Sequence, residues 1–438
     1  MRRIAVIGGG VAGIAAALSA SGRDTQVTLF ESLPRLGGRA AGADGVDTGR
    51  HLVLSSYVYF LDLLKRLGSH DEIHFTPLHF TALDGDAGYE LPFHTGVLSG
   101  ALAAGFALMV RNFLPPASRA AAVTALARTA ASAPGEPHDH QLAGDGKQRR
   151  FRRSGLISVD DLFDRLGWPE PLIERLGEPL ALAMGNASSL DLAAGMYLNA
   201  LARVLADTDP RSGWVTGERY GSVLSDPALW TLKGRGVDIR LGEGVRWVER
   251  TGDKWRIVSA IAERFDRVII TATPPRLNIL DGVPEAAPLL AWSKRMTGRA
   301  ILTIRARVYG PVQASGPIAE TTPPHGIWFR EWHPGGGVLL ERVISNMAND
   351  SDLDLDHTIM SFAQHAQQWF NAKVNEENVV VRFYPDATMT VAPKMLRPTV
   401  RQGPGLYYAS DLSATGLPAT LESAARAGLL AGTLATTD

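Results

Sequence analysis

The stretch Arg3-Ile4-Ala5-Val6-Ile7-Gly8-Gly9-Gly10-Val11-Ala12-Gly13 decides the fold of this chain. It joins a short apolar run, which predicts a strand, to a turn made of glycines. Residues 12–21 are rich in alanine, isoleucine and leucine and predict a helix, and residues 26–31 predict a second strand. A strand, a G-x-G-x-x-G turn, a helix and a strand in this order are typical of the first βαβ unit of a Rossmann-type fold.

Each glycine of the turn has its own physical role. Gly8 permits the tight turn, Gly10 lets the backbone approach a pyrophosphate because it has no Cβ, and Gly13 permits close helix–strand packing. The first helical N–H groups, at Val11-Ala12, carry a partial positive charge that attracts phosphate. Glu31 follows Gly13 by 18 residues, where its carboxylate can accept both hydroxyls of a ribose. The pattern predicts dinucleotide binding. The alternative is a turn that only packs a helix on a sheet.

A second glycine motif, Arg35-Leu36-Gly37-Gly38-Arg39, comes just after Glu31. It resembles the arginine–glycine–glycine segment of the flavin amine oxidase and phytoene desaturase superfamily. The resemblance implies that the dinucleotide is FAD and that Gly38 and Arg39 contact its diphosphate. A guanidinium suits this role because its planar fork binds phosphate through two hydrogen bonds. The alternative is an arginine turn at the surface.

A third motif, residues 410–420, separates a predicted strand from the last predicted helix. Asp411 can accept a hydrogen bond from a ribityl hydroxyl. Pro418, with Leu417 before it, suits the first turn of a helix because proline has no N–H to leave unsatisfied. That helix start would face the pyrimidine edge of the flavin and stabilise negative charge on the reduced ring. The alternative is a helix start with no ligand.

Three isolated positions extend the superfamily resemblance. Val245 resembles the valine whose backbone meets the adenine, and Thr273 lies in a turn that resembles the strand end returning to the nucleotide-binding core. Gly49 falls in the segment 47–51, where the resemblance implies backbone running past the isoalloxazine. These positions complete the predicted FAD-binding set.

The whole chain resembles the bacterial hydroxysqualene dehydroxylases, the squalene-associated FAD-dependent desaturases of hopanoid biosynthesis. The segments that carry this resemblance are residues 46–52, 174–180, 265–275 and 415–420. The chain departs from the family at Thr48 and Arg50, where Asn and Gln are usual. It departs again at Ser410-Asp411-Leu412, where Gly-Asp-Trp is usual.

This closer resemblance implies an enzyme that converts hydroxysqualene to squalene by reductive dehydroxylation. Such chemistry needs an apolar tunnel that excludes water and an acid that helps the hydroxyl to leave. His51 falls near the expected flavin ring and is the candidate acid; its alternative role is that of a buried structural histidine. An external electron donor is expected. Two other functions stay open: an oxidative desaturase of carotenoid or squalene type, and an isoprenoid-binding escort protein without redox chemistry.

The length of 438 residues suggests about two domains. We expect an α/β architecture in which a Rossmann-type FAD-binding domain (1–69, 232–284 and 401–438) is interleaved with a mixed α+β substrate domain of amine oxidase type (70–231 and 285–400). Helices are expected at 52–68, at 97–132 with a break at Pro115-Pro116, at 158–206 with breaks near Pro179 and 185–189, at 356–370 and at 419–434. Strands are expected within 237–271, 298–309, 326–346 and 405–409.

Composition narrows the functional classes. The net charge of -1 gives no field that would recruit nucleic acid. The absence of cysteine excludes disulfides, thiolate catalysis and cysteine-based metal sites, and the scattered histidines suggest no metal site.

Two segments raise the question of membrane contact. Residues 97–110 carry no charge, and residues 147–153 contain five cations. Fourteen residues are too few to span a bilayer, which takes about 20. Segments 97–114 and 147–153 would instead suit docking on an anionic leaflet, so a cytoplasmic protein peripheral to the inner face of the membrane is expected. The alternative is a helix in the domain core beside a solvated loop.

Overall fold

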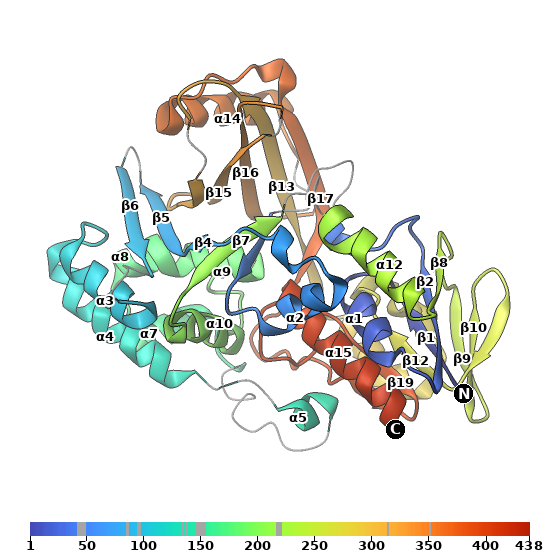
Figure 1. Ribbon diagram of the computed structural model, residues 1–438. Helices are drawn as coiled ribbons and strands as arrows, with labels where there is room; N and C mark the ends of the chain where they lie inside the picture. The colour runs from blue at the N-terminus through green and yellow to red at the C-terminus, as the bar shows by residue number, and fades with distance from the viewer. Residues whose placement is uncertain are drawn as a thin grey trace.

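The computed structural model describes residues 1–41, 50–84, 87–93, 98–133, 135, 138–144, 155–215, 221–312, 315–333, 335–349 and 352–438. Figure 1 shows a nucleotide-binding sheet with its helices at one end and a second large sheet, with helices beside it, at the other. The two chain termini lie close together at the nucleotide-binding end.

The nucleotide-binding sheet draws strands from distant parts of the sequence. Its order is β18 (Arg401–Gly403), β19 (Leu406–Tyr408), β12 (Arg267–Ile270), β1 (Arg2–Ile7), β2 (Thr25–Glu31) and β8 (Asp238–Leu241). All neighbours are parallel except β18 and β19. The inner strands β1, β2, β12 and β19 are largely buried on both faces, which explains their apolar runs, whereas the edge strand β8 is partly exposed.

Successive residues of these strands enter two different cores. On one face, Ile4 and Val6 pack with helices α1 (Val11–Ala20), α2 (Val58–Leu67), α12 (Asp226–Gly234) and α15 (Leu421–Thr437). On the other face, Ala5 and Ile7 pack in a core shared with the antiparallel sheet β9 (Trp247–Thr251), β10 (Lys254–Val258) and β11 (Ala262–Phe265). The predicted Rossmann-type α/β unit is therefore present.

The second large sheet has seven strands. Their order is β17 (Val380–Thr390), β13 (Thr297–Val308), β16 (Val338–Met347), β15 (Gly326–Trp332), β14 (Ser315–Glu320), β5 (His79–Asp84) and β6 (Ala87–Pro92). Helix α14 (Leu355–Phe370) covers one face, where the ring of Trp328 stacks on that of Phe362 with centroids 5.1 Å apart. The opposite face carries a separate small apolar cluster.

The remaining described elements join these two sheets. Short strands β3 (His51–Leu54), β7 (Arg211–Val215) and β4 (Thr76–Pro77) form a third sheet. The helices on the side of the seven-stranded sheet are α3 (Gly100–Val110), α4 (Pro116–Ser132), α7 (Val159–Leu166), α8 (Glu170–Leu172), α9 (Glu178–Gly185) and α10 (Ala194–Ala206). Helix α5 (Asp139–Ala143) packs instead against α15. Helix α13 (Ala287–Ser293) and the short helical turns η1 (Gly38–Ala41), η2 (His70–Glu72), η3 (Ile173–Gly177), η4 (Gly221–Ser225), η5 (Pro274–Leu280), η6 (Pro284–Ala286) and η7 (Glu376–Asn378) complete the set.

Three expected boundaries are wrong. The helix predicted at 52–68 begins at Val58, because the residues before it pair with β7 as strand β3. No gap between helices lies near Pro179: the chain stays helical over 170–185 and passes from the π-helical turn at 173–177 into α9 directly before this proline, which has no N–H to donate to the preceding turn. The last helix begins at Leu421 instead of including Pro418, because the hydroxyl of Thr420 caps it. The domain boundaries at 69, 231, 284 and 400 stay a prediction.

Candidate functional site

The turn after β1 requires glycine at two positions for reasons of packing. Gly8 has a φ of +109°, a backbone conformation that favours glycine. A Cβ added to Gly13 would lie 1.8 Å from the carbonyl oxygen of Gly8. Gly13 therefore allows the first turn of α1, which begins with Val11-Ala12, to pack closely against Gly8.

Gly10 differs from both, since protein packing does not require a glycine there. A Cβ on Gly10 would meet only the Cα of Gly38 within 4 Å, at 3.9 Å. Gly10 is also the N-cap of α1 and makes no side-chain cap hydrogen bond. The N–H of Gly37 donates to the carbonyl of Gly9 at 2.8 Å, which holds the second glycine motif against the first. This glycine-walled space in front of an uncapped helix start suits a pyrophosphate.

Glu31 is buried, and it organises the same turn. One of its oxygens, Oε2, accepts a hydrogen bond from the N–H of Gly9 at 2.6 Å, while Oε1 accepts from the N–H of Leu33 at 2.8 Å and from Ser32 Oγ at 3.1 Å. A carboxylate has about four acceptor positions. The bonds within the protein leave room for a ribose hydroxyl, so Glu31 can hold the turn and bind the nucleotide at once.

Val245 lies in a loop that is tied to the end of β2. The N–H groups of Gly242 and Glu243 donate to the carbonyls of Leu33 and Glu31, each at 2.9 Å. The half-buried Val245 follows two residues later. The structure thus brings the predicted adenine contact and the predicted ribose contact to one end of the sheet.

Thr273 follows β12 and borders the glycine turn through its neighbour Thr271. The hydroxyl of Thr271 donates to the carbonyls of Ile7 at 2.9 Å and Gly8 at 3.0 Å. Thr273 itself is the N-cap of the helical turn η5. Thr271 belongs to the strand-end turn that the resemblance indicated, but its contact with the glycine turn was not predicted, because it joins residues more than 260 positions apart.

Arg39 and Asp411, predicted from separate motifs, contact each other. Arg39 Nη2 lies 2.8 Å from Asp411 Oδ1, and the Asp411 carboxylate raises the pKa of Arg39. The Arg39 side chain is 37% exposed and that of Asp411 is 12% exposed. The second and third motifs therefore converge on one point, as the binding of a single extended cofactor requires.

The segment 410–418 is buried, and side chains from elsewhere hold its carbonyl groups. Arg397 donates through Nε to Leu412 O at 2.9 Å, and its other nitrogens donate to the carbonyls of Asp411 and Leu417. Asn199 Nδ2, on α10, donates to Gly416 O at 2.8 Å. Leu417 and Pro418 thus precede α15 in a fixed conformation. Arg397 and Asn199 were not predicted, and no local sequence signal marks them.

His51 begins β3, beside the cation of Arg39. Burial and the positive charge of Arg39 lower the pKa of His51 to about 4, although a hydrogen bond with the Ala40 backbone opposes this shift. The ring is therefore neutral at neutral pH. Gly49, predicted to run past the isoalloxazine, lies outside the described residues.

Arg50 bridges β3 to the seven-stranded sheet. Its Nη1 lies 2.6 Å from Glu331 Oε2 and its Nε lies 3.0 Å from Glu341 Oε1, and its guanidinium covers the ring of Phe329 at 5.2 Å. The Arg50 side chain is 1% exposed. This buried ion cluster was not foreseen, and it fixes the seven-stranded sheet against β3, the strand that carries His51.

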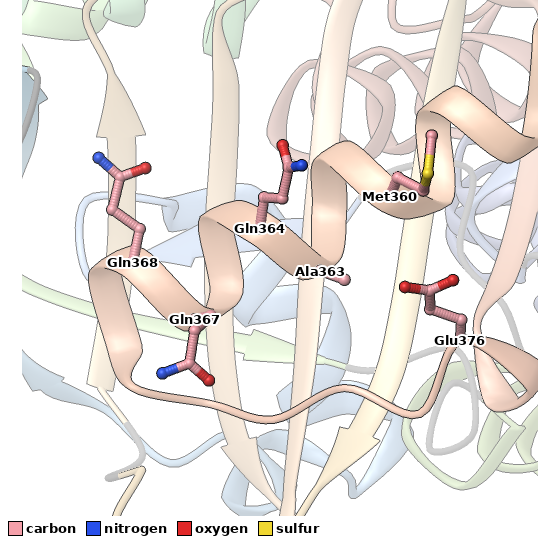
Figure 2. A pocket seen from close by; sticks show the side chains of 6 residues that line it. All are labelled: Met360, Ala363, Gln364, Gln367, Gln368 and Glu376. Atoms are coloured by element: carbon pink, nitrogen blue, oxygen red, sulfur yellow. The ribbon is translucent and has the colours of Figure 1, made fainter.

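Figure 2 shows a surface hollow formed by residues other than those predicted to bind FAD. Its lining residues are Met360, Ala363, Gln364, Gln367 and Gln368 of α14, with Glu376 beyond the helix. None of these residues belongs to the predicted cofactor set.

The residues present fit a bound FAD. The start of α1 and the open space beside Gly10 and Gly38 suit the diphosphate of FAD. Glu31 suits the adenosine ribose. The Arg39–Asp411 pair brings the second and third motifs together. Among the described residues, no group of three or more His, Asp or Glu side chains could hold a metal ion.

Comparison with known proteins agrees with this geometry. Residues 11–434 match the family described as flavin containing amine oxidoreductase. A hydroxysqualene dehydroxylase of Sinorhizobium fredii (strain NBRC 101917 / NGR234) is 25% identical over 454 residues, which cover 99% of this chain and 98% of that protein. A probable zeta-carotene desaturase of Synechococcus elongatus (strain ATCC 33912 / PCC 7942 / FACHB-805) is 25% identical over 260 residues, 57% of this chain and 52% of that protein.

The fold is shared with solved structures of low sequence identity. An oxidoreductase from Methanosarcina mazei superposes with a TM-score of 0.72 at 14% identity, over 98% of this chain and 99% of that one. The chain therefore belongs to the flavin-containing amine oxidoreductase family, and it is an FAD-dependent oxidoreductase of the amine oxidase and carotenoid desaturase superfamily.

Proposed function

We propose that this protein acts on a C30 isoprenoid and removes the hydroxyl group of hydroxysqualene to give squalene. One observation carries the proposal: the similarity to a hydroxysqualene dehydroxylase runs over nearly the full length of both chains, whereas the similarity to a zeta-carotene desaturase spans about half of that protein. A place in hopanoid biosynthesis and an external electron donor are parts of the same proposal.

A buried apolar cluster extends to the predicted cofactor residues, which supports a hydrocarbon substrate. On the sheet face opposite α14 the buried cluster consists of Ile301, Phe329, Val343 and Ala387, flanked by Ile327 and Tyr384. The carbonyl of Ala387 accepts a hydrogen bond from Arg39 Nη1 at 3.4 Å. A substrate chain lying on this cluster would approach the Arg39–Asp411 pair.

In the proposed reaction a C–O bond breaks, the hydroxyl leaves as water after gaining a proton, and a C–H bond forms. Reduced FAD, when bound, supplies the hydride. The protein must keep solvent away, since water would trap an allylic cation, and it must provide the proton. His51 is the candidate acid. Because its pKa is lowered to about 4, its ring is neutral at neutral pH, and its contribution should grow as the pH falls toward that value.

An anaerobic reaction tests this proposal. Photoreduced protein mixed with hydroxysqualene should form squalene in step with reoxidation of the flavin. The Gly10→Val variant, which we expect to lack FAD, is the control. The proposal is wrong if neither product nor reoxidation appears while a carotene or an amine turns over.

A second candidate is the oxidative desaturase, which the partial match to a zeta-carotene desaturase favours. In that case the oxidised protein should introduce further double bonds into a less unsaturated polyene and should leave hydroxysqualene untouched. An escort protein without redox chemistry would instead purify colourless and could not be reconstituted with FAD.

We further propose that the protein docks on an anionic membrane through α3. Four apolar side chains on one side of this helix, Leu102, Phe106, Met109 and Val110, are 48% to 71% exposed. Arg111 follows directly, and Arg119 donates to the carbonyl of Met109 at 2.9 Å, so cations border the apolar face. Such a combination suits insertion between anionic headgroups. Among the described helices, none is long and apolar enough to cross a bilayer.

Vesicle sedimentation tests the docking face. The protein should sediment with phosphatidylglycerol vesicles and less with phosphatidylcholine, and Phe106→Glu should reduce sedimentation. Trp230→Glu is the matched control, because Trp230 is 69% exposed on the distant helix α12. Equal loss in both variants would contradict docking through α3. The cationic segment 147–153 lies outside the described residues and stays a prediction.

A further inference from the structure

Four arginines contact either the segment that leads into α15 or the first turn of this helix, and they differ in their partners. Three of them pair with a carboxylate: Arg39 with Asp411, Arg203 with Glu422 at 2.9 Å, and Arg426 with Asp139 at 3.4 Å. The fourth, Arg397, pairs with no carboxylate among the described residues. It is therefore the one described cation beside this segment whose charge is not balanced by direct contact.

All partners of Arg397 are neutral groups. Its guanidinium donates to the carbonyls of Asp411, Leu412 and Leu417, to Ser423 Oγ at 3.2 Å, and to Met196 Sδ at 3.1 Å. The residue is 9% exposed. The planar guanidinium of Arg397 makes five hydrogen bonds. Because three of them join the carbonyls of Asp411, Leu412 and Leu417, they fix the path of the backbone between these residues.

The charge of Arg397 persists despite its burial. Burial lowers the pKa of Arg397 to about 10, and the Asp411 carboxylate opposes this shift. Arginine is therefore a cation at neutral pH. The carboxylate of Asp411 is already engaged by Arg39, and burial raises the pKa of the neighbouring Tyr408 phenol, which is neutral. A net positive charge thus lies on the inner side of a segment whose other side, under the proposed function, faces the flavin.

We propose that Arg397 is a positioning residue for FAD, which fixes residues 411–417 and adds a positive charge that favours the reduced, negatively charged flavin over the oxidised one. The proposal rests on the proposed placement of FAD against this segment. It assigns two separable effects to one side chain: hydrogen bonds that shape the segment, and a charge that raises the reduction potential of the bound cofactor.

The two effects can be separated by changing charge at Met196, which leaves Arg397 in place. Met196 is buried on α10 with its sulfur against the guanidinium. Met196→Glu would place a carboxylate on Arg397 and neutralise its charge, and Met196→Gln is the matched neutral control. A second pair, Arg397→Gln and Arg397→Lys, removes or keeps the charge while both lose the planar fork. The measurement is the midpoint potential of bound FAD, by reductive titration with reference dyes and without substrate.

The expected result is a more negative potential in Met196→Glu than in Met196→Gln, and in Arg397→Gln than in Arg397→Lys. The proposal is overturned if the FAD-loaded members of each pair share one potential. If the Arg397 variants fail to fold, the Met196 pair decides alone. If wild-type protein cannot be loaded with FAD, the cofactor placement has failed, and if it loads FAD and shows the shifts without dehydroxylating hydroxysqualene, only the substrate assignment has failed.

Discussion

The two ends of the proposed FAD site are built by opposite means. At residues 8–13 the site is made of backbone, and glycine is needed where a side chain would collide or would fill the space in front of α1. At residues 410–420 it is made by side chains: Arg397, Asn199 and Thr420 hold a buried segment that has no glycine-rich pattern. A backbone-built site leaves a short sequence motif, whereas a side-chain-built site is scattered through the sequence.

The largest expected effect comes from breaking the backbone-built end. Gly13→Ala places a Cβ 1.8 Å from the carbonyl oxygen of Gly8, so α1 must move away from β1. We expect a loss of about 2–4 kcal/mol in the free energy of unfolding together with loss of bound FAD. Urea unfolding of the apoprotein measures the first, and absorbance per protein the second. Near wild-type stability would mean that this close approach is not needed.

Gly10→Val should separate cofactor loss from fold loss. The added atoms meet little protein, since a Cβ at this position has Gly38 Cα as its nearest neighbour at 3.9 Å. The apoprotein should lose about 1 kcal/mol or less, mainly because valine is a poor N-cap. Bound FAD should be nearly abolished, because the side chain would occupy the pyrophosphate position. A full flavin load in purified Gly10→Val would place the diphosphate elsewhere.

His51 lies where the two ends approach each other, and it should make stability depend on pH. Its pKa is lowered from 6.5 to about 4 in the folded protein, so the unfolded chain binds the proton more readily. Stability is therefore full above pH 6.5 and falls as the pH drops toward 4, by on the order of 2 kcal/mol after allowance for partial exposure. Urea titrations from pH 7 to 4 should show a shallower dependence in His51→Asn. An unchanged dependence would assign the acid sensitivity to other groups.

The smallest expected effect concerns the N-cap of α15, at the end of the site that is built by side chains. Thr420→Ala removes the hydroxyl that accepts the N–H of Ser423 at 3.4 Å, and should cost about 0.5–1 kcal/mol in thermal or urea unfolding. Thr437→Ala, at the exposed end of the same helix, should cost less. Equal costs would show that this hydroxyl is not the effective cap of α15.

Sequence predicted the parts of the fold that depend on neighbouring residues. The βαβ unit follows from a local alternation of apolar runs and turns, and Pro116 marks the start of α4 as expected. Strand β3 was missed because its four residues are too few to show an alternation of apolar and polar side chains. Its partner β7 also lies about 160 positions later in the sequence. The start of α15 could have been found, since Thr420 directly precedes the apolar Leu421, a typical N-cap pattern.

The candidate site divides in the same way. Glu31, Gly38, Arg39 and Asp411 could be named from motifs, although nothing local indicates that Arg39 and Asp411 touch. Arg50 gives no sign in sequence that it is buried between Glu331 and Glu341, nearly 300 positions away. Which distant charges pair depends on how the chain packs, and a single sequence carries no local pattern that predicts such pairs.

The crossing of the first and last helices has a consequence for how the protein is made. Gly428 and Gly432 let α15 press against the backbone of α1, where a Cβ would lie 2.2 Å from Ala12 O and 2.5 Å from Ala16 O. The ribosome completes the cofactor turn about 400 residues before it reaches Gly428 and Gly432. Helix α1 therefore gains its close packing against α15 only after this later segment has been made, and we expect the nucleotide-binding unit to close around FAD after α15 has docked.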